Sequence, residues 1–300
     1  MVCIKDTLTG HTESVSTIVL LKNGYFASSS SDFTIKIWDV VTGLLNKTLI
    51  GHLGPVRTLA VLSNGDLVSG SGDTTIKIWD VDLGTVKKNL TGAFAIIFTM
   101  TILPNDDIVA GCGDRTIKIW DANTGTIKQT LSGHSGALRS LFVLPNGDLA
   151  SGATDRRIII WDLNSATVKK NLTGHSDWVT DLTILPNGYL VSGSLDKTIK
   201  IWDTDSGTLN KTLQSASGVL ATRVLPNGKI VTGSEDAKIK VWDAESGSLI
   251  EALEGHRTGV FSLIIVSNEK IISASDDKTI KVWEVPKFEF INLGKNKFLF

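Results

Sequence analysis

Tryptophan recurs through this 300-residue chain at an almost constant spacing. Seven of the eight tryptophans are separated by 41, 41, 41, 41, 40 and 41 residues, and six of the seven are followed by aspartate. The seven are Trp38, Trp79, Trp120, Trp161, Trp202, Trp242 and Trp283. Length alone would favour two domains. Because the copies fill the chain from end to end, we expect one domain instead.

Each copy contains four short segments with the properties of β-strands. In the fifth copy they are residues 179–185, 189–192, 198–203 and 208–213. The first two flank Asn187-Gly188, a pair that readily adopts the positive φ of a tight hairpin turn. Four-stranded units repeated every 40 to 45 residues are typical of propeller blades, which bury their two apolar faces by stacking around an axis. We therefore predict an all-β, seven-bladed β-propeller of four-stranded antiparallel blades.

The chain begins with a segment that matches the last strand of a copy but precedes the first copy. We expect this segment, residues 2–8, to pair outside the third strand of the last copy and close the ring, which protects an exposed sheet edge. Residues 288–293 are a competing candidate for that edge, although Pro286 and a one-residue offset weaken the match. The predicted propeller spans 1–285, and 286–300 form a C-terminal tail.

Three polar side chains keep a fixed distance from each repeated tryptophan. A histidine lies 27 residues before it, a serine or threonine 10 before and an aspartate 6 before. The five complete sets are His11, Ser28, Asp32, Trp38; His52, Ser69, Asp73, Trp79; His134, Ser151, Asp155, Trp161; His175, Ser192, Asp196, Trp202; and His256, Ser273, Asp277, Trp283. With these residues the chain resembles the WD-repeat family over nearly its full length. The resemblance implies that each set forms a buried, hydrogen-bonded tetrad.

Serine, histidine and aspartate are also the members of a nucleophilic triad. A triad needs one exposed serine beside an oxyanion hole, whereas this chain repeats the same spacing in five copies. The sets therefore indicate a structural role, and we expect no catalytic residue. Each histidine stands alone in its copy, so we expect no metal site and no cofactor.

Two copies lack part of the set. The third has Ala93 and Ala110 in place of histidine and serine, and the sixth has Ala216 in place of histidine. We expect backbone donors or water to hold Asp114 and Asp236 there. Six copies also carry a lysine in the third strand, which we expect to extend its amine into water: Lys36, Lys77, Lys118, Lys200, Lys240 and Lys281.

Charge and composition narrow the class of partner. Thirty basic and 31 acidic side chains give a net charge of −1, so no basic excess favours nucleic acid. We expect no export signal, because the first residues run directly into a repeat. The sequence has no run of 18 apolar residues and has two cysteines in unrelated positions. We expect a soluble, monomeric protein of the cytoplasm, with the nucleus as a second location, and neither a membrane nor nucleic acid as partner.

A partner must recognise positions at which the copies differ. The resemblance implies binding on the face formed by the loops entering the first strands and the turns between second and third strands. We expect a protein or peptide to bind there through Trp178, Phe98, Phe261, Leu195, Arg57 and Arg139, because aromatic residues and arginine dominate binding hot spots. In the sixth copy the positions flanking the first strand's valine are assigned to Val219 and Ala221. Phe98 and Phe261 have an alternative role as fillers of the channel wall.

Two functions follow from this surface. The first is a non-catalytic protein-interaction scaffold that binds a peptide or protein on the face around the central channel. The alternative is a propeller that binds or converts a small molecule over the channel, for which Glu235 and Asp276 are the available carboxylates.

Overall fold

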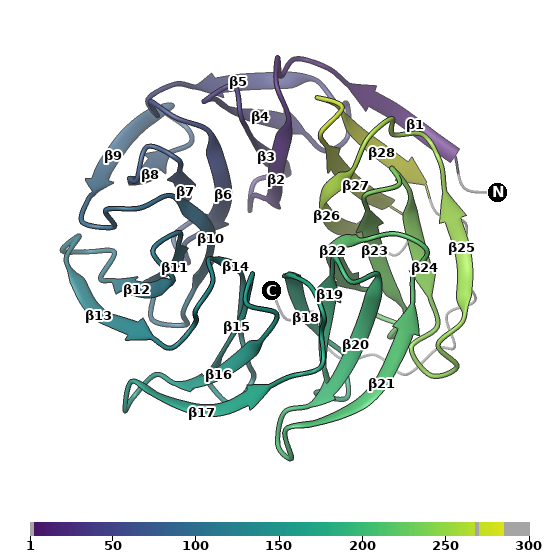
Figure 1. The fold of residues 1–300 in the computed structure, drawn as a ribbon. Coiled ribbons are helices and arrows are strands. Elements are labelled where there is room, and N and C mark those ends of the chain that lie inside the picture. Colours follow the sequence, from purple (N-terminus) through teal and green to yellow (C-terminus); the bar gives the residue numbers. More distant parts are fainter. Residues whose placement is uncertain (1–2, 268–269, 285–300) are drawn as a thin grey trace, which may run out of the picture.

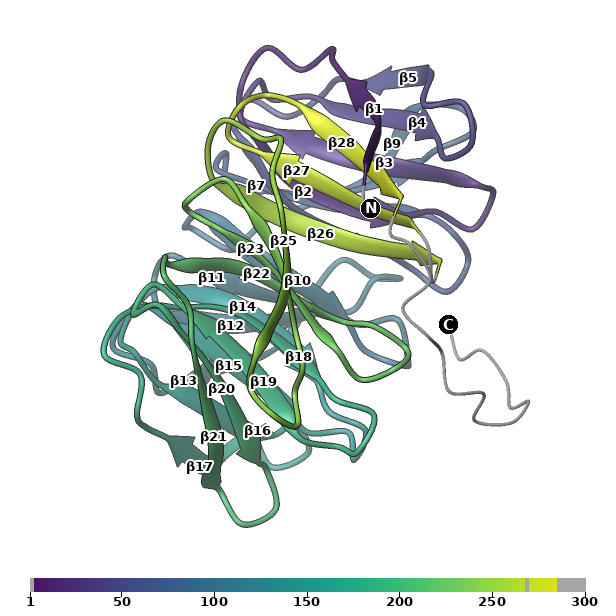
Figure 2. The ribbon, with the colours of Figure 1, turned by 90° about the vertical axis from the view of Figure 1, so that its right-hand side faces the viewer.

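Seven four-stranded antiparallel sheets surround a central axis (Figure 1). The computed structural model describes residues 3–267 and 270–284, and these residues contain strands and turns but no α-helix. No described segment is therefore a helix long and apolar enough to cross a bilayer. Seen from the side, the blades form a ring of stacked, twisted sheets (Figure 2). The predicted seven-bladed β-propeller is confirmed.

Each blade is built from an inner, a second, a third and an outer strand. The inner strands are β2 (Val15–Leu20), β6 (Val56–Val61), β10 (Ile97–Ile102), β14 (Leu138–Val143), β18 (Val179–Ile184), β22 (Val219–Val224) and β26 (Val260–Ser267). The second strands are β3 (Tyr25–Ser30), β7 (Leu67–Ser71), β11 (Ile108–Cys112), β15 (Leu149–Ala153), β19 (Leu190–Ser194), β23 (Ile230–Ser234) and β27 (Lys270–Ser275).

The two remaining strands of each blade lie toward the rim. The third strands are β4 (Ile35–Asp39), β8 (Ile76–Asp80), β12 (Thr116–Trp120), β16 (Ile158–Asp162), β20 (Thr198–Asp203), β24 (Ile239–Trp242) and β28 (Ile280–Glu284). The outer strands are β5 (Leu45–Leu49), β9 (Thr85–Leu90), β13 (Ile127–Ser132), β17 (Thr167–Leu172), β21 (Thr208–Gln214), β25 (Leu249–Leu253) and, for the seventh blade, β1 (Cys3–Leu8).

The N-terminal strand closes the ring as predicted. Strand β1 pairs with β28 in an antiparallel ladder in which Ile4 lies opposite Trp283 and Leu8 opposite Ile280. The seventh sheet thus joins β1 and β28, the first and last strands of the described residues (Figure 1). The competing segment 288–293 and the tail 286–300 lie outside the described residues.

The apolar core lies between the blades. Each of seven clusters joins two neighbouring sheets; the one across the closure unites Leu8, Ile272 and Val282 of blade seven with Val15 and Trp38 of blade one. Neighbouring sheets approach so closely that several second strands carry glycine: a Cβ on Gly111 would lie 2.6 Å from the Cβ of Leu138 in the next blade. Shape complementarity between blades therefore adds to hydrophobic burial.

The connections between strands lie on two opposite faces of the ring. The loops before the inner strands and the turns between second and third strands share one face, which we call the upper face. Every inner strand has a β-bulge immediately after its first residue, for example between Val56 and Thr58. Bulges redirect side chains, so one residue per blade is set apart from the ladder at the upper end of the channel.

Candidate functional site

The repeated polar residues form hydrogen-bonded chains inside the blades. In blade two, Trp79 Nε1 donates to Ser69 Oγ over 2.8 Å, while His52 places Nε2 2.7 Å from Ser69 Oγ and Nδ1 2.8 Å from Asp73 Oδ2. The same contacts occur in four further blades. One consistent donor order runs from indole to hydroxyl, from hydroxyl to imidazole and from imidazole to carboxylate.

These chains do not have the geometry of an active site. The serine of each complete set has no exposed surface, so a substrate cannot reach the hydroxyl. Every polar atom of the set instead has a partner within the blade, which is the arrangement that buried polar groups require. The five sets therefore fix the upper-face turns to the third strands.

In the tetrads of His52, His134 and His256, the environment favours a carboxylate beside a neutral imidazole. Burial alone would raise the pKa of Asp73, but hydrogen bonds from Thr75, Leu53 and His52 outweigh it and hold the pKa at about 2. The same balance lowers the pKa of the other four tetrad aspartates, Asp32, Asp155, Asp196 and Asp277. Burial lowers the pKa of three of the histidines, His52, His134 and His256.

The incomplete blades use lysine where the others use histidine. Lys118 Nζ lies 2.8 Å from Asp114 Oδ2, and Lys240 Nζ lies 2.6 Å from Asp236 Oδ2. The sequence interpretation was wrong in part: backbone donors do reach both carboxylates, but the third-strand lysine supplies the second contact. Four of these lysines are also buried instead of extending into water: Lys118, Lys200, Lys240 and Lys281.

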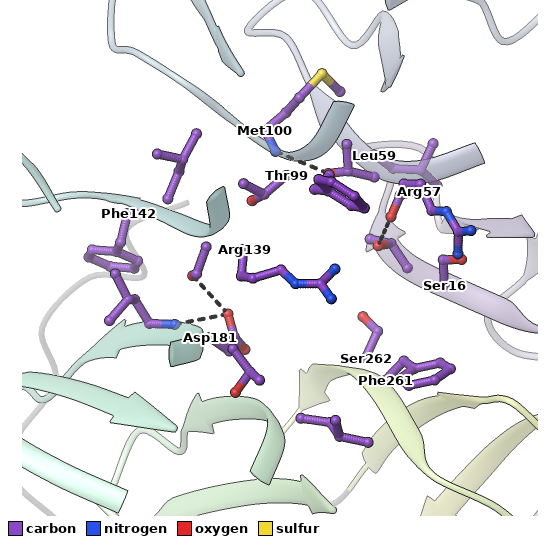
Figure 3. A pocket seen from close by; sticks show the side chains of 18 of the residues that line it. Ser16, Arg57, Leu59, Thr99, Met100, Arg139, Phe142, Asp181, Phe261 and Ser262 are labelled. Atoms are coloured by element: carbon purple, nitrogen blue, oxygen red, sulfur yellow. Dashed lines mark hydrogen bonds between the residues drawn. The ribbon is translucent and has the colours of Figure 1, made fainter. Parts of the chain in front are cut away.

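A cavity opens at the centre of the ring, and all six predicted partner-binding residues line it. Its volume is about 640 Å³. The bulged residue of each inner strand contributes one part of the wall. Among them are Phe98 and the three residues Arg57, Arg139 and Phe261, which are labelled in Figure 3. Trp178 precedes its inner strand, and Leu195 lies on the turn beside it, where its amide donates to the Trp178 carbonyl. Glu235 also lines the cavity, whereas Asp276 is not among the lining residues.

The sixth blade corrects one sequence assignment. Its bulge falls between Val219 and Ala221, so Leu220 occupies the position assigned to Ala221, and Gly218 the position assigned to Val219. Leu220 lines the cavity, whereas Val219 and Ala221 are buried. The blade is one residue shorter than the others before this strand, which shifted the sequence register. The same shift makes the assignment of Ala216 to the histidine position wrong: the buried Ser215, 27 residues before Trp242, occupies it, and Ala216 is exposed.

Arginine and aromatic rings are stacked in the wall of the cavity. The guanidinium carbon of Arg139 lies 4.8 Å from the centroid of the Phe98 ring and 4.8 Å from that of the Trp178 ring. Trp178 and Phe261 each remain 39% exposed. Stacking orients the guanidinium and stabilises it by cation–π attraction, so three predicted residues from three blades act as one unit.

One ion pair in the cavity was not predicted. Arg223 Nη1 lies 3.0 Å from Asp181 Oδ2, which joins blades six and five. Asp181 also accepts a hydrogen bond from the backbone nitrogen of Thr222 at 2.7 Å. The sequence held a signal for Asp181: most other copies have threonine or serine at the position just after the bulge, so a carboxylate stands out there.

The repeat geometry agrees with a comparison to known families. The model of the "WD domain, G-beta repeat" (WD40) family matches the chain seven times, at residues 2–39, 43–80, 84–121, 125–162, 166–203, 207–243 and 247–284. This chain belongs to the WD40 family. No curated protein matches it. Each WD40 match begins just before an outer strand and ends at the Trp-Asp pair or its Trp-Glu equivalent. It therefore combines the outer strand of one blade with the first three strands of the next.

WD40 propellers are typically protein-interaction scaffolds and are generally non-enzymatic. In this WD40 chain, the residues shared among copies build the tetrads and inter-blade cores. The residues that differ among copies converge on the cavity. The scaffold and the candidate binding surface are therefore made from separate sets of positions.

Proposed function

We propose that this WD40 propeller is a non-catalytic scaffold that binds a peptide segment of a protein partner at the upper mouth of its channel. The observation that supports this most directly is the convergence of six non-repeated side chains from five blades on one cavity. Among them are an exposed indole and two arginines, the residue types that dominate binding hot spots.

The cavity has room for side chains of a bound segment. Its volume of about 640 Å³ also falls in the range of small-molecule pockets, which keeps the alternative of a small ligand over the channel. Catalysis would need a positioned acid or base; the described wall of the cavity contains neither histidine nor cysteine, and of its carboxylates Asp181 is paired with Arg223 and Glu235 is exposed. The polar and aromatic wall favours peptide recognition. We further propose that the protein acts as a monomer in the cytoplasm.

Selection of short random peptides on the immobilised propeller tests this function. We expect the selected peptides to bind wild type and to lose binding to Trp178→Ala. Leu83→Ala is the matched control, because Leu83 is 74% exposed on the turn between β8 and β9, on the opposite face. Circular dichroism confirms that each variant keeps its fold. Peptides that bind wild type and Trp178→Ala equally would refute the proposal. So would a parallel screen of small molecules that yields ligands for the cavity while the peptide selection yields none.

A further inference from the structure

The aromatic cleft of the cavity is occupied by the protein's own cation. Phe98 belongs to blade three, Arg139 to blade four and Trp178 to the loop entering blade five, and the guanidinium lies 4.8 Å from both ring centroids. A second cation therefore finds this cleft filled. Figure 3 shows Arg139 extending from its strand toward the middle of the cavity. The edge of the guanidinium, which carries the N–H donors, remains available to a ligand.

Two of the guanidinium groups that line the cavity have no anionic partner among residues 3–267 and 270–284. Neither Arg57 nor Arg139 takes part in a salt bridge, whereas Arg223 is paired with Asp181. Burial lowers the pKa of Arg139, and the positive charge of Arg57 lowers it further. A desolvated charge that shares a cavity wall with a second charge of the same sign is unfavourable without a counter-charge. An anion between them would relieve both effects.

Negative charge lies on a different part of the wall. Glu235 is exposed in blade six, where its carboxylate lies over Gly218; a Cβ there would be 2.7 Å from the Glu235 carboxyl carbon. Asp181 is already neutralised by Arg223. The cavity is thus basic toward blades two and four and acidic toward blade six, so it distinguishes the charges of an entering segment.

We propose that the cavity recognises an acidic peptide, with an aspartate or glutamate side chain inserted between Arg57 and Arg139. This inference rests on the proposed function and specifies its ligand. Arginine presents parallel N–H donors that match a planar carboxylate. The rings on Arg139 fix the plane of that fork in advance, which lowers the entropic cost of binding. Arg139 thereby sets specificity by donating to an anion and by keeping other cations out of the aromatic cleft.

Peptide libraries with a fixed central residue and randomised flanks test the charge preference. The fixed residue is glutamate, glutamine, lysine or phosphoserine, and binding is followed by fluorescence anisotropy at several salt concentrations. We expect the glutamate library to bind at least about tenfold more tightly than the glutamine and lysine libraries, with affinity falling as salt rises. Equal binding of glutamate and glutamine libraries overturns the proposal, and so does a preference for phosphoserine over glutamate.

Arginine variants locate the site. We expect Arg139→Gln to weaken glutamate-library binding roughly thirtyfold and Arg57→Gln roughly tenfold, because each removes a partner of a partly desolvated carboxylate. Arg139→Lys keeps the charge but loses the planar fork, so its binding should remain weakened. Arg156→Gln is the matched control: it makes the same charge change on an exposed upper-face turn outside the cavity wall. Equal losses for Arg156→Gln and Arg139→Gln would contradict a specific site.

Removal of Arg139 is expected to produce a gain of binding, which a misfolded variant would not show. In Arg139→Ala the cleft between Phe98 and Trp178 is empty, so a guanidinium from a ligand can enter it. We expect this variant to gain binding to an arginine-centred library that wild type does not bind. No gain, with the fold retained, contradicts the role assigned to Arg139. If selected peptides bind the upper face without any charge preference, the scaffold function stands and this inference fails.

Discussion

Blades two and three are neighbours with the same strand order, yet they hold the same turn in different ways. In blade two His52 connects Asp73 to Ser69 and Trp79, and Lys77 turns away to Asn89 on the outer strand, 2.9 Å from its Oδ1. In blade three Ala93 and Ala110 remove the middle of that chain. Lys118 contacts Asp114 there, and the Trp120 indole is left with a backbone carbonyl at 3.4 Å.

The comparison shows which part of the tetrad is essential to the turn. The aspartate accepts backbone or threonine hydrogen bonds in both blades and always has a nitrogen donor at its second oxygen. The donor is histidine where histidine is present and lysine where it is absent. The carboxylate thus organises the turn, while the histidine serves mainly to connect the turn to the buried indole.

The sixth blade is intermediate between these two. It keeps the indole contact, from Trp242 Nε1 to Thr232 Oγ1 at 2.9 Å, but pairs Asp236 with Lys240. It also contains two buried hydroxyls without a hydrogen-bond partner, Thr222 Oγ1 and Ser234 Oγ. Unpaired buried hydroxyls destabilise a fold, so blade six should open before the complete blades.

The largest effect is expected when both candidate partners of Asp73 are removed. His52→Ala leaves Asp73 and Ser69 short of a partner, and we expect Lys77 to move onto Asp73 as Lys118 does in blade three. His52→Ala should then cost about 3 kcal/mol and Lys77→Met less than about 0.5 kcal/mol. The double variant should lose about 1 kcal/mol more than their sum. Urea unfolding of the four proteins measures this coupling, and strict additivity would show that the lysine does not substitute.

The next effect separates the lysines of the two kinds of blade. Lys240 is buried against Asp236, whereas Lys200 donates to Thr212 Oγ1 at 3.0 Å in the complete fifth blade. We expect Lys240→Met to lower the free energy of unfolding by about 1.5 kcal/mol and the matched Lys200→Met by less than about 0.5 kcal/mol. Similar losses for the two variants would mean that both lysines contribute only their apolar stems.

Repetition explains how much of this molecule the sequence predicts. The tryptophan spacing predicts the number of blades, and the unmatched segment 2–8 predicts the closing strand; both are confirmed. The tetrad positions follow from the same spacing, because a fixed offset from tryptophan in five copies places the side chains on equivalent strands and loops. The variable positions likewise identify six residues that line one cavity.

The tryptophan spacing does not predict which way a flexible side chain points. It also does not predict where in a shortened copy a residue is missing. Lys118 and Lys77 occupy the same position, yet the amine reaches Asp114 in the blade without histidine and Asn89 in the blade with it. The position of the bulged residue Leu220 was assigned to Ala221, because the sequence of a shortened copy does not show where the residue is missing. The Arg223–Asp181 pair crosses two blades and depends on their packing.

Mild acidity, between about pH 7 and pH 5.5, should destabilise the histidine blades more than the lysine blades. The pKa of His52, His134 and His256 is lower in the folded protein than its usual value of about 6.5. The unfolded chain therefore binds protons first, and stability present above about pH 6.5 is lost as the pH falls. A second loss follows from about pH 4 down to about pH 2, where Asp73, Asp155 and Asp277 become protonated.

Variants assign the first of these losses. Removing a titrating histidine with His134→Ala should flatten the decline of melting temperature between about pH 7 and pH 5.5. Lys118→Met should leave that slope unchanged, because it leaves every titrating histidine in place. A steeper slope in His134→Ala, or a melting temperature that rises as the pH falls, would contradict the direction derived from burial of the imidazole.

The smallest expected effect is the repair of blade three. Ala93→His with Ala110→Ser restores an acceptor for the Trp120 indole and a second donor for Asp114, and should stabilise the fold by about 0.5 kcal/mol, because new hydrogen bonds are offset by desolvation. Ala110→Ser alone gives the indole an acceptor but leaves the hydroxyl without histidine, so it should be neutral or destabilising. Hydrogen exchange at residues 113–116 follows the turn itself. If the single variant equals the double one, the indole contact alone sets the stability of the blade, and the histidine adds nothing that lysine does not already supply.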